Sequence, residues 1–513
     1  MTELGGVLIL DGKTYGRYKD KLLYKCMPFA PDLPSCLIPY EERTKTFSKY
    51  KINKYISFRI DNLIPPIGMR TPPIGMITNV IGDVDNIDAY TNYQLLVNGL
   101  NSSLKTLNAA TVNSLREKSL FNLQDHKIAD RRTWKIISID PEGCTDIDDA
   151  IGLKQDETGV KNNELVLSIY IANVPMVLEN LNLWSVLSDR ISTIYLKDKK
   201  IPMLPPILSD DRCSLLQGED RIALALDVHI NTITKSILKY SHQTVVIRVE
   251  KNYVYENAEL LSRLDYQTIL KLGENLNRTL RYVSDLSDSH QLIEFCMILM
   301  NYECSQILLN KNRGIFRSAS KNKADMETSV SYNIPLDCKH ILQNIVGEYC
   351  SVAEVKPHEL MGCDDGGLPT YVHITSPIRR LVDCLNMLEI QRDTLITSRE
   401  ARQFLEKWLD KIPYINEKNK AIRRLQNDVA LLHLYQPVYT QPVYTQPVYI
   451  GMVFAQTSPK ADLFKYRVYI PVIKCLTSVY SSIDVPNYSF KNFTLHWFLD
   501  ESKMHKKMRL QMV

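Results

Sequence analysis

Residues 138–153 read SIDPEGCTDIDDAIGL and carry five carboxylates within ten positions. The apolar stretch WKIISID leads into this cluster, and DAIGLK continues directly from it. Both stretches have the composition of buried β-strands. A solvated acidic loop would not be followed at once by an apolar run. The pattern therefore predicts two strands joined by a loop that holds several negative charges against the edge of a hydrophobic core.

Crowded carboxylates raise one another's pKa values unless a cation neutralises them. Asp140 is expected at the end of the first strand, and three more aspartates where the chain enters the second: Asp146, Asp148 and Asp149. Oxygen ligands on such a loop suit Mg²⁺ or Mn²⁺. Two alternatives stay open on these residues alone. One is an acidic turn without a role, and the other is a calcium loop, although alanine and isoleucine stand at the fifth and sixth EF-hand positions.

A second motif, YVHITSPIRRLVDCLNMLEIQR, spans residues 371–392. Ser376 is predicted to cap a helix, with Pro377 as the first helical residue. Arg379 would then project from the first turn, where free backbone N–H groups and the helix dipole favour anions. This outlines a phosphate site. The alternative is an exposed i,i+4 ion pair between Arg379 and Asp383.

These two motifs, IDPEGCTDIDDA and YVHITSPIRRLVD, resemble the signatures of the RNB family, which comprises ribonuclease II, ribonuclease R and the catalytic subunit of the exosome. Between them lie RISTIYLKDKKIPMLPPILSDDRCSLLQGEDRIAL and LIEFCMILMNYECSQILLNK, in the family's order and spacing. The resemblance covers roughly residues 125–430. It implies a processive, metal-dependent 3′→5′ exoribonuclease that releases nucleoside 5′-monophosphates from single-stranded RNA.

The resemblance also implies roles for individual residues. Metal binding falls to four aspartates, with the first and last as direct ligands: Asp140, Asp146, Asp148 and Asp149. Asp148 is the aspartate whose loss most impairs cleavage, and Arg379 lies beside the scissile phosphate. The family's physics is consistent with this, since divalent cations activate water and an arginine stabilises the phosphate oxygens.

The remaining predicted substrate contacts are Tyr195, His373, Ser376 and Arg380. Tyr195 matches the aromatic residue that stacks on the terminal base, and stacking accepts any base. His373 by itself favours a partly buried structural histidine. Phe316 is the candidate for the family's second stacking aromatic residue. The 2′-hydroxyl of RNA is the expected discriminator against DNA.

The chain departs from the family at several positions. Tyr170 and Asn173 stand where eukaryotic members often read HIADV, and Leu381 replaces a common tyrosine. Gln426 occupies the place of a glutamate that assists catalysis in the bacterial branch. The loss of the acidic residue at Asn173 affects local hydrogen bonds but not the aspartate cluster, and from Gln426 we expect slower or differently tuned turnover.

The predicted fold class is α+β multidomain, with cold-shock/OB-like β-barrel modules flanking a central α/β RNB catalytic domain. Residues 1–50 form an unassigned β-rich segment, 51–125 a cold-shock-like barrel and 126–430 the catalytic domain. Residues 436–450 read QPVYTQPVYTQPVYI, and a proline at every fifth position predicts a linker that is neither helix nor central strand. Residues 451–513 are expected to form a small OB-like RNA-binding barrel.

A net charge of +4 permits a polyanionic partner, and eleven cysteines without a C-x-x-C pair argue against a zinc ribbon. No signal peptide or bilayer-spanning run is recognised, so we expect an intracellular protein without a membrane partner. It is expected to act as a monomer without an exosome tether. Two other functions stay open: an RNB scaffold that binds RNA 3′ ends without cutting, and a metal-dependent DNA exonuclease.

Overall fold

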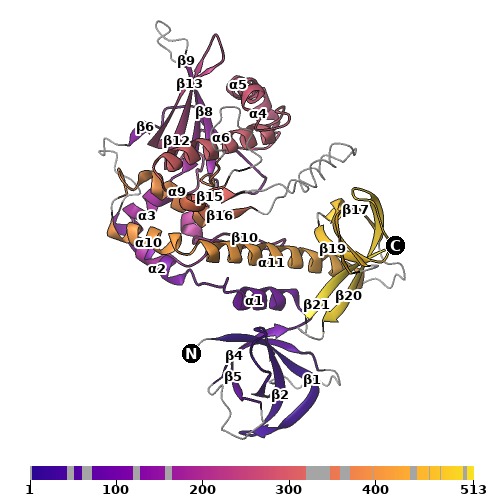
Figure 1. The fold of residues 1–513 in the computed structure, drawn as a ribbon. Coiled ribbons are helices and arrows are strands. Elements are labelled where there is room, and N and C mark those ends of the chain that lie inside the picture. The colour runs from indigo at the N-terminus through magenta and orange to yellow at the C-terminus, as the bar shows by residue number, and fades with distance from the viewer. Residues whose placement is uncertain are drawn as a thin grey trace.

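The computed structural model describes residues 3–42, 51–60, 72–118, 128–155, 164–318, 347–356, 358, 370–396, 398–439, 448–460, 463–473, 475–500 and 505–513. Figure 1 shows a central body of helices around a sheet, with a smaller curled sheet near each end of the chain. The architecture is therefore mixed α/β and multidomain, as predicted.

The N-terminal sheet has five antiparallel strands in the order β3-β2-β1-β4-β5. The strands are β1 (Leu4–Tyr18), β2 (Lys21–Pro28), β3 (Cys36–Tyr40), β4 (Lys54–Ile60) and β5 (Gly75–Asp83). A bridge between Leu37 and Ile74 brings the two edges together around a core that includes Leu8 and Phe58. The boundary predicted at residue 50 falls between β3 and β4, so the segments on either side of it share one sheet.

Two helices lead from this sheet to the central body, α1 (Ile87–Val97) and α2 (Lys105–Glu117). The Asn86 side chain caps α1 by accepting from the Ala89 N–H at 2.9 Å. At the other end of α1, the Lys418 ammonium donates to the Asn98 carbonyl at 2.6 Å. Lys418 belongs to the long helix α11 (Ile412–Tyr439), so this bond fixes the N-terminal part of the chain to the central body.

The central sheet has seven strands in the order β14-β7-β8-β9-β12-β13-β6. They are β6 (Ala129–Arg131), β7 (Ile136–Asp140), β8 (Asp149–Gln155), β9 (Glu164–Ala172), β12 (Asp220–Asn231), β13 (Ile237–Arg248) and β14 (Lys251–Val254). The strands predicted on both sides of the acidic cluster are thus confirmed. Residues 156–163, between β8 and β9, lie outside the described residues.

Helices cover both faces of this sheet. Alternate strand residues point to opposite sides, so each strand contributes to the cores on both faces. Ile137 and Ile169 face the cluster formed with α5 (Leu264–Leu280) and α6 (Ser289–Asn310). Ile136 and Tyr170 face the other cluster, which packs against further helices: α3 (Val174–Asn180), α9 (Leu381–Gln391) and α10 (Arg399–Leu409). The short α4 (Ala258–Ser262) precedes α5. Among the described helices, α6 alone has the length and composition to cross a membrane, and 56% of that segment is buried inside the protein.

Short elements complete the central body. They are η1 (Trp184–Val186), β10 (Ile194–Tyr195), β11 (Lys200–Ile201), η2 (Ile207–Arg212), β15 (Ile315–Ser318), β16 (Glu348–Ser351) and η3 (Val352–Glu354). The pairs β10–β11 and β15–β16 are small antiparallel ribbons. Both ribbons contribute residues to the site described below.

The C-terminal sheet has five antiparallel strands in the order β19-β18-β17-β20-β21. They are β17 (Val448–Lys460), β18 (Leu463–Ile470), β19 (Cys475–Ser481), β20 (Phe490–Asp500) and β21 (His505–Met512), with η4 (Pro471–Ile473) between β18 and β19. The sheet curls over a core that includes Val453 and Phe493, consistent with an OB-like module.

The pentapeptide repeat was predicted to be a linker, but both of its ends lie in regular secondary structure. Helix α11 ends at Tyr439, inside the first copy, and β17 begins at Val448, inside the third. The prediction that its prolines exclude a helix was wrong for the first copy. Pro437 falls in the last turn of a 28-residue helix, and the missing N–H there disrupts only the helix end. The residues between, 440–447, lie outside the described part of the chain.

Candidate active site

The loop between β7 and β8 carries the four predicted aspartates. Asp140 is the last residue of β7 and Asp149 the first of β8, and the two strands pair antiparallel. Gly143, at φ +77°, supplies the left-handed turn that a side chain would disfavour. Ser214 holds the loop in place, since its hydroxyl accepts from the Ile147 N–H at 3.0 Å and donates to the Thr145 carbonyl at 2.8 Å. The loop is therefore fixed against the core.

The aspartates perturb one another as the crowding predicted. Burial, offset in part by a Ser138 hydrogen bond and increased by Asp146, raises the pKa of Asp140 to about 6. Burial also raises the pKa of Asp148 to about 7, against the opposing charge of Arg379. For Asp149, burial and then the neighbouring Asp140 and Asp148 hold the pKa well above its usual value. Neutral pH thus leaves these groups under strong pressure to bind a proton or a cation.

Three of the four carboxylates each keep one buried oxygen, Oδ2, without a hydrogen-bond partner in the described structure: Asp140, Asp148 and Asp149. No three His, Cys, Asp or Glu side chains of the described residues are arranged as a complete metal-binding group. Mg²⁺ is usually held by one or two carboxylates, with water and substrate phosphate as its other ligands. The donor set therefore fits a divalent cation at Asp140 and Asp149, whose carboxylates make no ion pair with a side chain of the described residues and each keep an unpartnered oxygen.

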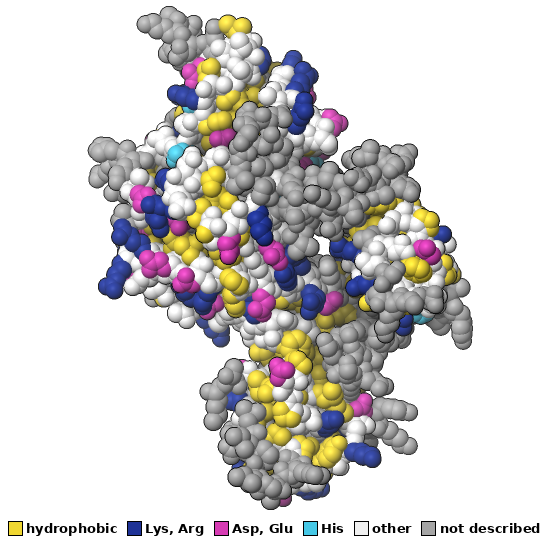
Figure 2. Space-filling view, in the orientation of Figure 1, with side chains coloured by type: hydrophobic (Ala, Val, Ile, Leu, Met, Phe, Trp, Pro, Cys, Tyr) yellow, Lys and Arg dark blue, Asp and Glu magenta, His cyan; other side chains and the backbone are white. Residues whose placement is uncertain are grey.

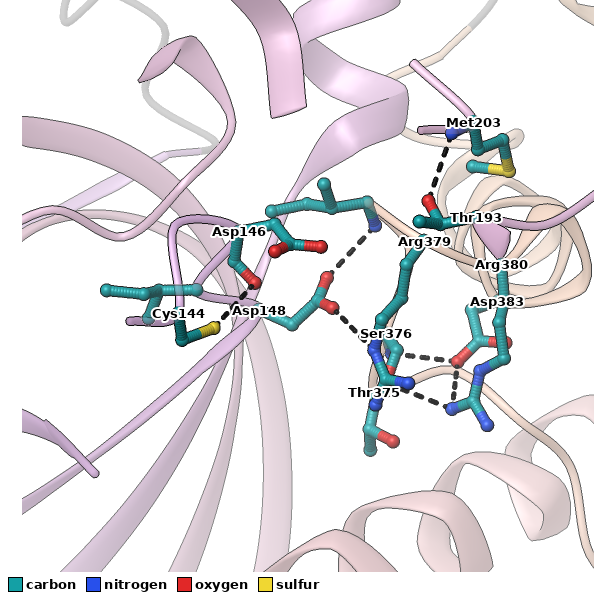
Figure 3. Close-up of polar contacts among 12 residues, drawn as sticks. Cys144, Asp146, Asp148, Thr193, Met203, Thr375, Ser376, Arg379, Arg380 and Asp383 are labelled. Carbon is teal, nitrogen blue, oxygen red and sulfur yellow. Dashed lines mark hydrogen bonds and ion pairs between the residues drawn. The ribbon is translucent and has the colours of Figure 1, made fainter. Parts of the chain in front are cut away.

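Asp148 connects the acidic loop to the second motif (Figure 3). Its Oδ1 accepts from the Ile378 N–H at 2.9 Å, and its Oδ2 lies 3.3 Å from Arg379 Nε. The carboxylate is 4% exposed, whereas the Arg379 side chain is 44% exposed. The guanidinium therefore contacts the buried acid on one side and remains accessible on the other.

The second motif folds differently from the prediction at its start. Helix α9 begins at Leu381 with Arg380 as its N-cap residue, so the prediction of Ser376 as the cap was wrong. Residues 376–380 form a tight turn, in which the N–H groups of Arg379 and Arg380 donate to the Ser376 carbonyl at 3.2 and 2.9 Å. The reason is Asp383, which accepts from the Ser376 N–H and from the Arg380 guanidinium, both at 2.8 Å.

This arrangement excludes the alternative of an exposed ion pair between Arg379 and Asp383. Asp383 is fully buried and pairs with Arg380 instead. Arg379 consequently projects from the turn toward Asp148 rather than along the helix.

Tyr195 lies on β10 beside the acidic loop. Its hydroxyl donates to Asp146 Oδ2 at 2.7 Å, and burial followed by this bond raises the pKa of the phenol. The residue is still 41% exposed, so the ring has an open side. Gln426, from α11, donates to the Tyr195 carbonyl at 2.9 Å. The residue at the position of the bacterial glutamate thus supports the strand that carries Tyr195.

A cavity of about 240 Å³ opens beside these residues. Of the predicted residues, it is lined by Tyr195, His373, Arg379, Arg380 and Gln426. Ser376 is buried and lies outside the lining, although it accepts from Arg380 at 3.1 Å. The lining is rich in arginine, which suits a polyanion.

Three basic residues of the lining were not predicted: Arg317, Lys420 and Arg423. Lys420, Arg423 and Gln426 recur at three-residue spacing on one face of α11, and this pattern was the available signal. The face of the molecule that Figure 2 shows mixes basic and acidic side chains.

The predictions for His373 and Phe316 have different outcomes. His373 lines the cavity, with its Nδ1 2.7 Å from the Tyr349 hydroxyl, and burial lowers its pKa well below the usual value. Phe316 is 1% exposed and packs in the core, so its prediction as a stacking residue was wrong. Strand residues alternate, and on β15 it is the next residue, Arg317, that faces the cavity.

The departures from the family pattern have structural partners. Asn173 caps α3, where its side chain accepts from the Met176 N–H at 3.2 Å. Tyr170 and Leu381 are buried in the same hydrophobic cluster. None of these three residues lines the cavity.

Parts of this chain are similar to known proteins. The family model described as "RNB domain" matches residues 128–285. DIS3-like exonuclease 2 of Schizosaccharomyces pombe is 31% identical over 177 residues, which are 34% of this chain and 18% of that protein. The matched segment therefore spans less than a fifth of that curated relative.

Two solved structures have a similar fold. Mycoplasma genitalium RNase R, in complex with ribose-methylated single-stranded RNA, superposes with a TM-score of 0.69 at 16% identity, over 99% of this chain and 89% of that one. Yeast Ssd1, a pseudonuclease, gives 0.62 at 16% identity over 96% and 66% of the two chains. At these identities the two structures establish the shared fold.

Proposed function

The chain belongs to the RNB family, and on that basis we propose that it is a metal-dependent 3′→5′ exoribonuclease that hydrolyses single-stranded RNA to nucleoside 5′-monophosphates. One observation carries the proposal. Buried aspartate oxygens without partners lie beside an arginine that is also accessible from a basic cavity. This combination suits a phosphodiester, which is anionic and needs charge stabilisation during cleavage.

Each residue has a task that follows from its surroundings. Asp140 and Asp149 would hold a Mg²⁺ or Mn²⁺ ion through their unpartnered oxygens. When bound, such an ion supplies Lewis-acid stabilisation of the charge that develops on the phosphate. Asp148 fixes Arg379 through the contact at 3.3 Å, so that the guanidinium can donate to the non-bridging phosphate oxygens.

The cavity would receive the 3′ end of the RNA. Tyr195 offers its exposed ring to a base, and its hydroxyl bond to Asp146 fixes the ring orientation. Arg317 and Arg423 neutralise backbone phosphates without reading sequence, whereas Lys420 already pairs with Glu348 of the lining at 2.7 Å. In this scheme the curled terminal sheets are RNA-binding modules of cold-shock and OB type, and the chain acts alone.

An RNB scaffold without cleavage activity is the second candidate, favoured by the likeness to a pseudonuclease fold. The four aspartates and the Asp148–Arg379 contact argue for the enzyme.

One experiment separates these functions. The protein is incubated with uniformly labelled single-stranded RNA or DNA, first with Mg²⁺ and then with EDTA. Mononucleotide release from RNA alone, abolished by EDTA, supports the proposal. RNA binding without release supports the scaffold, and release from DNA would identify a DNA exonuclease.

A further inference from the structure

Asp146 differs from the other three aspartates of the loop. Both of its carboxylate oxygens have donors, since Oδ2 accepts from the Tyr195 hydroxyl at 2.7 Å and Oδ1 from the Lys200 ammonium at 3.1 Å. The residue is 8% exposed. A cation that approached Asp146 would have to displace one of these donors.

Lys200 is fixed where it lies. The antiparallel ribbon pairs Tyr195 with Lys200, so β10 and β11 deliver both donors to the same carboxylate. Besides Asp146, the Lys200 ammonium donates to Asp210 Oδ1 at 3.0 Å and to Thr145 Oγ1 at 2.9 Å. An ammonium has three N–H donors, and all three are occupied. Lys200 is therefore a structural cation rather than a free contact for substrate.

Two of the four aspartates of the loop have a cationic side chain as an ion-pair partner. Arg379 pairs with Asp148, and Lys200 pairs with Asp146. Asp140 and Asp149 make no ion pair with a side chain of the described residues, so together they carry at most two negative charges without a paired cation, and each keeps one unpartnered buried oxygen. Asp210, which shares Lys200, is more exposed, at 30%, and solvent screens part of its charge. One divalent cation is sufficient to neutralise the remaining pair.

We propose that Lys200 is a positioning residue whose ammonium takes the place of a second divalent cation at Asp146 and keeps that carboxylate oriented toward Tyr195. The proposal rests on the metal-dependent function above, which it deepens by assigning the cation a single site. A positive charge hydrogen-bonded to Asp146 repels a divalent ion at the same carboxylate. Asp146 is then an anchor for two side chains and not a metal ligand.

Mn²⁺ binding to the full chain tests this without any need for cleavage. Electron paramagnetic resonance counts bound Mn²⁺ in the unaltered protein and in Lys200→Met, with far-UV circular dichroism to confirm folding. We expect one tight Mn²⁺ in the unaltered protein and two in Lys200→Met. Lys199→Met is the matched control, because the neighbouring Lys199 pairs with Asp88 at 2.8 Å instead. It should bind one ion, as should Lys200→Arg, which keeps the charge.

A second variant keeps the test decisive if Lys200→Met does not fold. Asp146→Asn should leave the Mn²⁺ dissociation constant within about threefold of the unaltered protein, whereas Asp149→Asn should weaken binding more than tenfold. Two ions in the unaltered protein, one ion in folded Lys200→Met, or a tenfold loss in Asp146→Asn would overturn the inference alone. No Mn²⁺ binding to the unaltered protein would overturn the metal-dependent function together with it.

Discussion

Replacing Asp148 with asparagine should stabilise the metal-free protein and stop cleavage at the same time. The carboxylate is 4% exposed, and burial raises its pKa from the ordinary 3.8 to about 7. Each pKa unit corresponds to about 1.4 kcal/mol, so ionised Asp148 destabilises the folded protein by roughly 4 kcal/mol at pH 8. Asparagine carries no charge and can still accept from the Ile378 N–H.

The gain is partly offset at Arg379. The loss of the ion pair is already contained in the raised pKa of Asp148, but in the Asp148→Asn variant an amide N–H donor would face the Arg379 Nε–H donor at about 3.3 Å, and two donors without an acceptor cost about 1–2 kcal/mol. We therefore expect Asp148→Asn to be about 2 kcal/mol more stable than the unaltered protein at pH 8 in EDTA.

The pH dependence gives the sign of the effect. Between pH 4 and pH 7 the folded protein keeps a proton on Asp148 that the unfolded chain has lost, so the stability of the unaltered protein falls as pH rises through this window. At pH 5 the advantage of the variant should shrink by roughly 2–3 kcal/mol, to zero or below.

Urea denaturation in EDTA at pH 8 and pH 5 measures these differences, and the labelled RNA assay with Mg²⁺ measures cleavage. Asp383→Asn is the matched control, because it is a buried aspartate in an ion pair at 2.8 Å with Arg380. Breaking that pair should destabilise the protein by about 3 kcal/mol. An Asp148→Asn variant that is less stable at pH 8, with no change in the gap at pH 5, would refute the reasoning. So would cleavage at the unaltered rate.

Three further predictions concern the substrate side of the site. Tyr195→Ala should weaken RNA binding by about 10- to 100-fold in fluorescence anisotropy, because the stacking of a base on the ring is lost. Tyr195→Phe keeps the ring and should retain most of the affinity, so equal affinities for the two variants would exclude stacking. Arg379→Lys should lower kcat about 10- to 100-fold with little change in KM, because the charge is kept but the planar fork is lost; an unchanged kcat in single-turnover kinetics would contradict this role. Arg423→Ala should reduce the slope of log affinity for RNA against log salt concentration by about one, because one phosphate contact is lost. Arg424→Ala, the next residue of α11 but outside the cavity lining, should leave this slope unchanged, and equal slopes for the two variants would show that Arg423 does not contact RNA.

The sequence was most informative where hydrophobic spacing decides the structure. The strands around the acidic loop formed as predicted. The start of α9 could not be read in the same way. Ser376 and Pro377 form a good local capping signal, but Asp383 takes the Ser376 N–H and draws Arg380 out of the helix. A local helix-capping preference worth about 1 kcal/mol is outweighed by the contacts of a buried ion pair.

Phe316 shows a second limit. Sequence reasoning identified the right ribbon for a cavity residue but the wrong face, because neighbouring strand residues point in opposite directions and a choice of one position decides between core and cavity.

The electrostatics of the acidic loop had to come from the folded chain. Four nearby carboxylates predict neutralising cations but not their source. Two of the cations are side chains distant in sequence: Lys200 is 54 positions beyond Asp146, and the turn that carries Arg379 bonds to Asp148 across 230 positions. Neither residue is marked as a partner of an aspartate by local spacing. Each of these side chains pairs with one carboxylate, so Asp140 and Asp149 are the two aspartates of the loop without an ion-pair partner among the described residues. In the proposed scheme these two residues set the need for a divalent cation, and the number of acidic residues in the sequence gives only its upper limit.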